Sequence, residues 1–286
     1  MLFTTPFTFG KRETTLDKAK YAIVGVPFDA SESYRVGSRY APMAIREASR
    51  ELEDYDILEE YDLTKIRICD VGDVEISYGY FEETSKRVTA TIKEILENKV
   101  IPVVLGGEHT ITYSVLKAYE NKELRVVIFD AHLDFREEYL GNRFSHACVI
   151  RRIGEIVGYE NILVVGVRSA LREEHEEARD KGVKILKANE FDPSEVVKHV
   201  KDKEVYISID FDVFDPKEAP GVCNPEPQGL SFKEVVDSME FLKYCKLSGF
   251  DVVEITPLYD SYTQVLAAKL IFKILSKNDK AWEHTR

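Results

Sequence analysis

Cysteine, glutamine and long apolar runs are all scarce in this sequence of 286 residues. Its four cysteines, Cys69, Cys148, Cys223 and Cys245, form no Cys-x-x-Cys pair, so we expect free thiols in a reducing compartment rather than a disulfide framework. No stretch approaches the roughly 18 to 20 apolar residues that a membrane helix needs. The first residues also lack the basic and apolar segments of a secretion signal. We therefore expect a cytoplasmic protein without membrane-spanning segments.

Basic residues are outnumbered by acidic ones. The chain has 39 Lys and Arg against 51 Asp and Glu, which gives a formal net charge of −12. Nucleic acids and anionic membranes both require clustered Lys and Arg, so neither is an expected partner. A negative protein attracts cationic substrates over a distance. The same charge also serves solubility, and the composition alone does not separate these two roles.

Short apolar runs recur along the whole chain, with helical patterns between most of them. They are rich in Val and Ile, as expected of strands buried on both faces. Eight such runs predict an α/β fold with three layers, α-β-α, in which helices cover both faces of a mostly parallel sheet. We expect this fold to form a single domain over residues 1–286. The expected strands are Tyr21–Val26, Ile66–Cys69, Ile101–Leu105, Val126–Phe129, Ile162–Val165, Val183–Leu186, Val205–Ile209 and Val252–Ile255.

Three stretches carry apolar residues at helical spacing, namely 82–98, 231–242 and 261–275. In the second of them, Ser231 and Glu234 have the spacing of a capping box. The apolar stripes predict core packing against the sheet and not a ligand site.

Side chains with metal-ligand chemistry follow three of the expected strands. Because open parallel sheets bind ligands outside the carboxyl ends of their strands, we expect these side chains to meet at one edge. If the backbone stays extended past each strand end, every second side chain points to the same side. Buried carboxylates at that edge require partners, and cations would supply them. The candidate ligands are His109, Asp130, His132, Asp134, Asp210 and Asp212.

The number of charges among these residues indicates how many cations they hold. Four Asp bring −4, which two divalent cations would neutralise. Mostly oxygen ligands with two His suit Mn²⁺ better than a structural Zn²⁺ site. A water shared by two such ions loses a proton near neutral pH and becomes a nucleophile. Alone, His109 fits a tight turn, and Asp210 with Asp212 fits a helix cap. The three motifs combined predict a binuclear metalloenzyme.

In this order, the motifs resemble the ureohydrolase family of arginases and agmatinases. Further matches to family motifs are Gly25–Asp29, Ser33–Pro42, Ala219–Gly221 and Glu254–Asp260, so the resemblance covers nearly the whole chain. It implies the arginase-like fold, with an eight-stranded sheet. It also implies two shared ligands, since one metal would be held by His109, Asp130, Asp134 and Asp210, and the other by Asp130, His132, Asp210 and Asp212.

The resemblance also implies catalytic roles. Glu254 would accept the guanidinium of the substrate, and a carboxylate is the natural partner of that planar fork of donors. His146 would shuttle protons, for which an imidazole has a suitable intrinsic pKa. Asp134 would hydrogen-bond the attacking nucleophile. The implied reaction is hydrolysis of a guanidinium to an amine and urea.

The segment Phe135–His146 is similar to the corresponding loop of agmatinases. Agmatine hydrolysis to putrescine and urea is therefore the expected activity, which would place the chain in polyamine biosynthesis. Aminopropylagmatine, guanidinobutyrate, arginine and formiminoglutamate remain alternative substrates. Glu137 or Glu138 is expected near the far amine of a dicationic substrate.

Other readings of the same residues remain open. A single-zinc deacetylase of related architecture fits less well, because both His109 and His132 accompany all four Asp. A non-catalytic, metal-bound polyamine-binding protein would not need His146 or Glu254. Relatives form trimers and hexamers, which predicts a homo-oligomer. The remaining histidines, His175, His199 and His284, lie in no motif and are expected at the surface.

Overall fold

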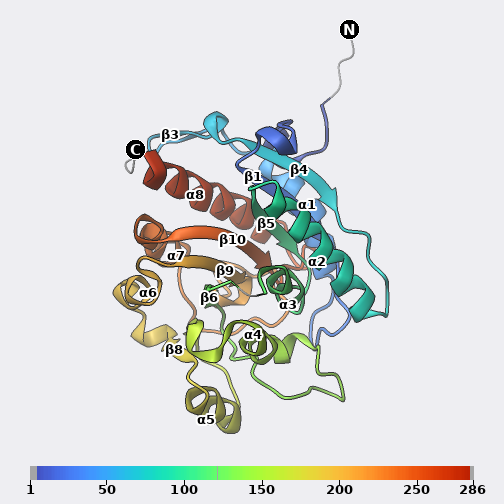
Figure 1. Cartoon of the computed structure of the whole chain (residues 1–286), viewed down its shortest axis with the longest axis vertical. Coiled ribbons are helices and arrows are strands. Elements are labelled where there is room, and N and C mark those ends of the chain that lie inside the picture. Colours follow the sequence, from blue (N-terminus) through green and yellow to red (C-terminus); the bar gives the residue numbers. More distant parts are fainter. Residues whose placement is uncertain (1–4, 121, 284–286) are drawn as a thin grey trace.

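A computed structural model describes residues 5–120 and 122–283. In these ranges eight strands form one sheet in the order β4-β1-β5-β10-β9-β6-β7-β8 (Figure 1). Each described pairing in this sheet is parallel, which confirms the predicted α/β fold. The strands are β1 (Tyr21–Val26), β4 (Ile68–Asp73), β5 (Ile101–Gly106), β6 (Arg125–Phe129), β7 (Ile162–Val167), β8 (Lys184–Lys187), β9 (Glu204–Asp210) and β10 (Lys246–Val253). A separate antiparallel pair joins β2 (Tyr55–Asp56) to β3 (Tyr61–Asp62).

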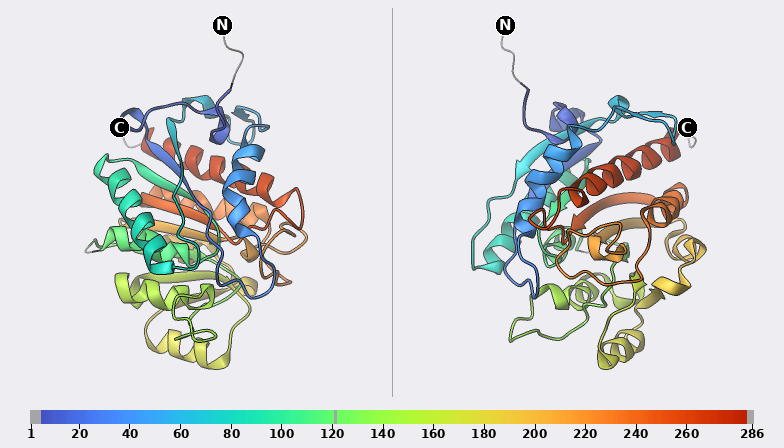
Figure 2. Two further views of the ribbon diagram at one scale, coloured as in Figure 1. Left: turned by 90° about the vertical axis from the view of Figure 1, so that its right-hand side faces the viewer. Right: turned by 180° about the vertical axis from the view of Figure 1, so that it is seen from behind.

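Helices cover both faces of the sheet, which gives the three predicted layers (Figure 2). One face carries α1 (Ala41–Ser49), α6 (Pro193–Val200), α7 (Phe232–Ser238) and α8 (Thr263–Glu283). The other face carries α2 (Phe81–Glu97), α3 (Ile111–Leu116), α4 (Val149–Val157) and α5 (Arg172–Asp180).

Alternation of side chains along the strands divides the apolar core into two clusters. In β6, Val127 and Phe129 pack on the side of α8, while Val126 and Ile128 pack on the side of α4. All four side chains are fully buried. The Val- and Ile-rich runs in the sequence therefore correspond to strands covered on both faces.

The largest error in the predicted elements concerns β10. Its predicted run began at Val252, but the strand begins at Lys246 and ends at Val253. The polar residues Ser248 and Asp251 interrupt the apolar pattern there, although Asp251 is fully buried and accepts hydrogen bonds from neighbouring hydroxyls. The last helix is also longer than predicted: α8 continues to Glu283, beyond the predicted end at residue 275.

The expectation that three histidines lie at the surface is wrong for His199. It is only 4% exposed on α6, and its Nε2 lies 3.0 Å from the carbonyl oxygen of Asn161. Apolar neighbours at helical spacing, Val196 and Val200, bring its face of α6 into the core. His175 is half-buried, and His284 lies outside the described residues.

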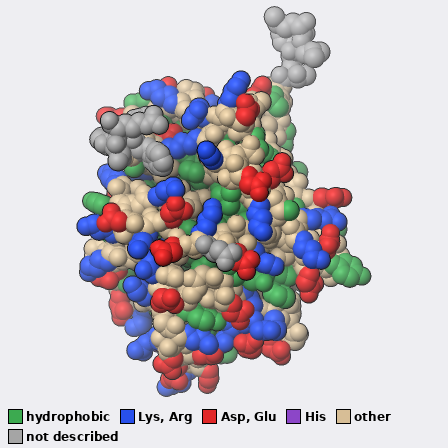
Figure 3. Space-filling model, in the orientation of Figure 1, with side chains coloured by type: hydrophobic (Ala, Val, Ile, Leu, Met, Phe, Trp, Pro, Cys, Tyr) green, Lys and Arg blue, Asp and Glu red, His purple; other side chains and the backbone are tan. Residues whose placement is uncertain are grey.

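The structure also bears on the cysteines, on membrane-spanning helices and on the distribution of surface charge. All four cysteines are free. Within residues 5–120 and 122–283, no helix has the length and apolar character needed to cross a membrane. On the face drawn in Figure 3, acidic and basic side chains are interspersed, so the net charge is not gathered into one patch there.

Candidate metal centre and active site

The six predicted ligands converge at the carboxyl edge of the sheet. They follow β5, β6 and β9, and only β10 separates β5 from β9 in the strand order. The side chains form two overlapping groups with metal-ligand spacing, one of His109, Asp130 and Asp134, the other of Asp130, His132 and Asp212. Asp210 joins the first group, with Oδ2 3.3 Å from His109 Nδ1.

His109 reaches the edge through a tight backbone approach after β5. Gly107 N donates to Val26 O at 2.9 Å, and a Cβ on Gly107 would lie 1.9 Å from the carbonyl oxygen of Phe28. Only glycine fits such an approach. The Gly-Gly pair of the motif therefore lets the chain turn closely enough to bring His109 over the strand ends.

The imidazole of His109 faces three carboxylates. Its Nδ1 lies 3.2 Å from Asp130 Oδ2, 3.3 Å from Asp210 Oδ2 and 3.6 Å from Asp134 Oδ2. On the other side of the ring, Nε2 lies 3.0 Å from Ser208 Oγ, whose hydroxyl donates to Asp251 at 2.6 Å. Ser208 therefore accepts from Nε2–H, which leaves the lone pair of Nδ1 directed at the carboxylates, as in metal-ligating histidines.

The second group is centred on His132. Its Nδ1 lies 2.8 Å from Asp212 Oδ2 and 3.8 Å from Asp130 Oδ1. Asp130 thus contacts both imidazoles, His109 through Oδ2 and His132 through Oδ1. This is the arrangement expected of a bridging carboxylate.

The backbone past the strand ends is extended only in part, because His132 still forms a parallel bridge with Ser169 whereas turns occur at other positions. Asp134 has a left-handed conformation with φ 42°, and Glu254 has φ 64°. Asp212 lies in a 3-10 turn, Phe211–Val213, and its backbone N–H donates to Asp210 Oδ1 at 2.9 Å. The predicted residues therefore converge, but through turns at Asp134 and Asp212 rather than through continued strands.

Burial and mutual repulsion perturb the protonation of this group. Burial, followed by the charges of Asp134 and Asp212, raises the pKa of Asp130 to about 7. Burial and the neighbouring carboxylates also raise the pKa of Asp210. Burial by itself would lower the pKa of His132, but the carboxylates, Asp212 first, raise it to about 11. The cluster of carboxylates therefore carries more negative charge than the cationic side chains around it neutralise.

The donor set fits divalent cations. Within the described part of the chain, His109 Nδ1 and Asp130 Oδ2 are buried and have no hydrogen-bond partner. Both atoms belong to the converging groups, and unpaired buried atoms of this kind are costly unless something else satisfies them. Oxygen and imidazole ligands suit borderline and hard divalent metals.

A cavity of about 300 Å³ opens onto these carboxylates. His146 and Glu254 both line it, as do Asp134, Asp210 and Asp212. The cavity therefore combines the metal-ligand group with the two other predicted site residues.

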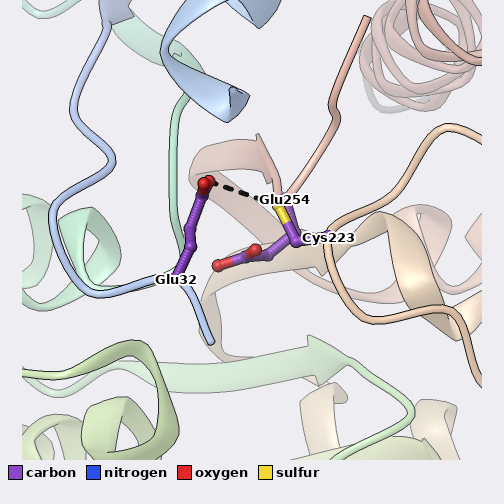
Figure 4. A group of neighbouring side chains, drawn as sticks. All are labelled: Glu32, Cys223 and Glu254. Carbon is purple, nitrogen blue, oxygen red and sulfur yellow. Dashed lines mark hydrogen bonds between the residues drawn. The ribbon is translucent and has the colours of Figure 1, made fainter. Parts of the chain in front are cut away.

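Glu254 is buried, and only one of its two carboxylate oxygens accepts a hydrogen bond from the described residues. Oε1 accepts from the backbone N–H of His109 at 2.5 Å, while Oε2 is buried with no hydrogen-bond partner among the described residues. Figure 4 shows its neighbours Cys223 and Glu32, whose side chains are joined by a hydrogen bond from Cys223 Sγ to Glu32 Oε1 of 3.3 Å. Burial, then the charge of Glu32, raises the pKa of Glu254.

His146 occupies the cavity wall beside the chain's early loop. It is 6% exposed, and its two ring nitrogens lie near the hydroxyls of Ser31 and Ser33, at 3.2 Å and 3.3 Å. Burial lowers the pKa of His146. A neutral imidazole at this position can accept a proton from the cavity and return it.

Glu137 does not approach the cavity, contrary to the sequence-based expectation. Its exposed carboxylate forms ion pairs with exposed Arg143 and with the buried side chains of Arg151 and Arg152. The loop residues that do line the cavity include Tyr139 and Arg136, and Nε of Arg136 lies 3.5 Å from Glu174 Oε1. Glu138 is exposed and is not among the lining residues of the described chain.

Comparison with known proteins identifies the family. The model of the arginase family matches residues 19–276. The chain belongs to the arginase family. Among curated relatives of this arginase-family chain, an agmatinase of Pyrococcus horikoshii is 40% identical over 283 residues, which cover 96% of this chain and 98% of the relative. An N(1)-aminopropylagmatine ureohydrolase of Thermococcus kodakarensis is 39% identical over 90% of each chain.

Solved structures of arginase-family proteins share the fold over nearly the full length. The agmatine ureohydrolase of Thermoplasma volcanium superposes with a TM-score of 0.93 at 37% identity, covering 99% of this chain and 98% of the other. The predicted arginase-like topology is therefore confirmed.

Several residues of this arginase-family site escaped prediction from the sequence. Ser208 stands two residues before Asp210 on β9, so strand alternation could have indicated that it lies on the same side as that ligand. Glu108 directly precedes His109 and is fully buried. Ser31 carried no recognisable signal, because its contacts with the cavity wall depend on the path of a loop.

Proposed function

We propose that this chain is a binuclear-metal ureohydrolase that hydrolyses agmatine to putrescine and urea. The observation that carries the proposal is the cavity lined both by members of the Asp and His cluster and by Glu254, whose Oε2 has no hydrogen-bond partner among the described residues. Membership of the arginase family supports the reaction class, and relatives named agmatinase support the substrate.

The metal ligands are proposed as two overlapping sets. Asp130 and Asp210 belong to both sets: Asp130 contacts both imidazoles, and Asp210, which contacts His109, is proposed to be shared as well. The oxygen-rich donor set favours Mn²⁺ as the resident ion. Two divalent cations held there supply the positive charge that makes water a nucleophile near neutral pH. The first set is His109, Asp130, Asp134 and Asp210, and the second is Asp130, His132, Asp210 and Asp212.

Glu254 is proposed to bind the guanidinium. Its Oε2 needs a donor, and a guanidinium offers N–H groups in a planar fork that matches a carboxylate. This contact orients the guanidinium carbon toward the carboxylate cluster. Asp134, which lines the cavity beside the cluster, is proposed to accept a hydrogen bond from the attacking water and so to align it.

His146 is proposed to move the proton that the leaving group needs. The amine nitrogen of agmatine takes the electron pair of the breaking C–N bond and must be protonated to leave. The imidazole lies in the cavity wall with its ring edge exposed to that space. Its lowered pKa means that, once protonated, it gives up its hydrogen readily.

The outer part of the cavity does not by itself set the length of the substrate. Arg136 and Glu174 pair there, so the lining offers both signs of charge to the far end of a substrate. Relatives named for agmatine and for aminopropylagmatine are nearly equally similar to this chain. Aminopropylagmatine is therefore the second candidate substrate.

The remaining proposals concern the whole protein. We propose one ureohydrolase domain over residues 1–286, acting in the cytoplasm as a homo-oligomer, either a trimer or a hexamer. Its partner is a small cationic guanidino compound rather than a nucleic acid or a membrane, in keeping with the net charge of −12.

A urea assay with a substrate panel tests the function. The Mn²⁺-loaded protein is incubated with agmatine, aminopropylagmatine, arginine, guanidinobutyrate and formiminoglutamate, and urea, formamide and the amine products are quantified. We expect urea and putrescine from agmatine, with the highest kcat/KM of the panel. Formamide release, or turnover confined to a carboxylate-bearing substrate, would contradict the assignment.

A further inference from the structure

Ser31 joins the cavity histidine to a buried carboxylate that the proposed reaction does not use. Its Oγ lies 2.8 Å from Glu108 Oε1, 3.2 Å from His146 Nδ1 and 2.9 Å from the backbone nitrogen of His146. Its backbone N–H donates to the other oxygen, Glu108 Oε2, at 2.6 Å. Three residues from distant parts of the chain thus form one continuous set of hydrogen bonds.

The donors and acceptors in this set can be assigned by counting hydrogens. A serine hydroxyl has one hydrogen and two lone pairs, and an ionised carboxylate can only accept. Ser31 therefore gives its hydrogen to Glu108, and one lone pair accepts the backbone N–H of His146. The lone pair that remains faces His146 Nδ1, which completes the set only if Nδ1 carries a hydrogen.

The other ring nitrogen is on the cavity side. His146 Nε2 lies 3.3 Å from Ser33 Oγ, and both His146 and Ser33 line the cavity. Ser33 Oγ is also 3.3 Å from Asn224 Oδ1. Its hydroxyl can donate to Asn224 while accepting from a protonated Nε2, or turn to donate to a bare Nε2. The surroundings of Nε2 thus tolerate both of its protonation states.

We propose that Glu108 and Ser31 lock neutral His146 in the Nδ1–H tautomer, so that Nε2 is the atom that gains and loses the proton. This role presupposes the proposed ureohydrolase reaction. Imidazolium gives its Nε2 hydrogen to the amine nitrogen, which holds the electron pair of the broken C–N bond. His146 then returns to the neutral Nδ1–H form without turning over. Glu108 and Ser31 act as positioning residues, because neither lines the cavity within the described residues.

One neighbouring hydroxyl competes with this assignment. Ser145 Oγ lies 3.4 Å from His146 Nδ1, and by donating to it would favour the opposite tautomer. The contact with Ser31 is shorter, at 3.2 Å, and the hydrogen of Ser31 is already taken by Glu108. The variant Ser145→Ala separates the two possibilities, because it removes only the competitor.

Solid-state ¹⁵N NMR of histidine-labelled protein reads the tautomer directly. The protein is loaded with diamagnetic Mg²⁺ and measured near pH 9, where His146 is neutral and Glu108, whose pKa burial raises to about 7, is ionised. The variant His146→Asn assigns the signal, since the chain has only six histidines. We expect a protonated Nδ1 and an unprotonated Nε2 in the parent protein and in Ser145→Ala.

The variant Glu108→Gln should reverse the tautomer. Its amide oxygen can still accept from Ser31 N–H, so its amide nitrogen donates to Ser31 Oγ, and the hydroxyl then donates to Nδ1. Ser31→Ala should leave the tautomers mixed. In both variants we expect kcat to fall by about tenfold or more, with an altered pH profile and little change in KM, since a general acid contributes roughly a hundredfold or more. Metal content is measured alongside, because Glu108 is next to His109.

Ser248→Ala is the matched control. It removes a hydroxyl that donates to the carboxylate of Glu204 at 3.2 Å, far from the cavity, and should leave both the spectrum and kcat unchanged. An Nε2–H signal in the parent protein would overturn the proposal, as would an unchanged signal in Glu108→Gln. A parent protein with the Nδ1–H form but no urea release would contradict the proposed function but not the proposed tautomer of His146.

Discussion

At the scale of single residues, the site depends on polar atoms that lack partners in the protein alone. His109 Nδ1, Asp130 Oδ2 and Glu254 Oε2 are buried and have no hydrogen-bond partner among the described residues, and all three belong to the groups around the cavity. Proteins rarely leave buried polar atoms unsatisfied. The first two atoms fit cations, and the third fits a donor on the substrate.

Glu254→Ala is expected to keep both metal ions and to lose turnover. Removing a preorganised polar contact to the reacting group costs about 3 kcal/mol, so kcat/KM for agmatine should fall by roughly a hundredfold or more. Glu254→Gln should behave similarly, although its amide oxygen can still accept from His109 N–H. Metal analysis and a urea assay check both variants.

The control for these variants is Glu195→Ala, which removes an exposed carboxylate paired with Lys198 on the surface. It should match the parent protein in metal content and kcat/KM. Near-normal agmatine turnover by Glu254→Ala would remove Glu254 from the guanidinium site.

At the scale of elements, the sequence allowed the sheet and the convergence of the candidate metal ligands to be predicted because both depend on local patterns. Val- and Ile-rich runs identify buried strands, and a polar motif directly after a run identifies a strand end. The first half of β10 was missed because half-buried Ser248 and buried Asp251 are held by hydrogen bonds, which no apolar pattern reveals. The turns at Asp134 and Glu254 were missed because left-handed backbone in non-glycine residues is set by tertiary contacts.

The helix α6 carries a buried histidine whose titration should be visible in stability. Burial lowers the pKa of His199 to about 4, below the ordinary value of about 6.5. Between these values the unfolded chain binds a proton that the folded chain does not. The stability that neutral His199 contributes is thus present above about pH 6.5 and is lost as the pH falls toward about 4, by roughly 3 kcal/mol in total.

His199→Gln is expected to reduce that slope, because its amide can still donate to Asn161 O but does not titrate. Urea unfolding at a series of pH values between about 6.5 and 4.5 measures the free energy of unfolding of both proteins. His175→Gln, which removes an imidazole from α5, is the control. Parallel curves for the parent protein and His199→Gln would show that His199 does not titrate in this way.

At the scale of the whole molecule, bound cations should stabilise the fold. The carboxylates that raise the pKa of Asp130 and Asp210 repel each other when no cation is bound. A ligand that binds only the folded protein adds about 2.7 kcal/mol at a hundred times its Kd. Chelation with EDTA is therefore expected to lower Tm by roughly 5 to 10 °C, measured by calorimetry.

Asp210→Ala should abolish that response, because it removes a carboxylate proposed to bind both ions. Its Tm should not rise when Mn²⁺ is added. Asp237→Ala, which removes an exposed carboxylate paired with Lys233, should respond to Mn²⁺ as the parent protein does. A parent protein whose Tm is unaffected by EDTA would argue against cations as part of the folded site.

The convergence of ligands from three strand ends on two cations is tested most directly by anomalous diffraction. Crystals grown with Mn²⁺ are measured on both sides of the manganese absorption edge. We expect two peaks per chain, one beside His109 and one beside His132, with Asp130 and Asp210 in contact with both. A single peak, or no peak at these residues in crystals of active protein, would contradict a binuclear centre.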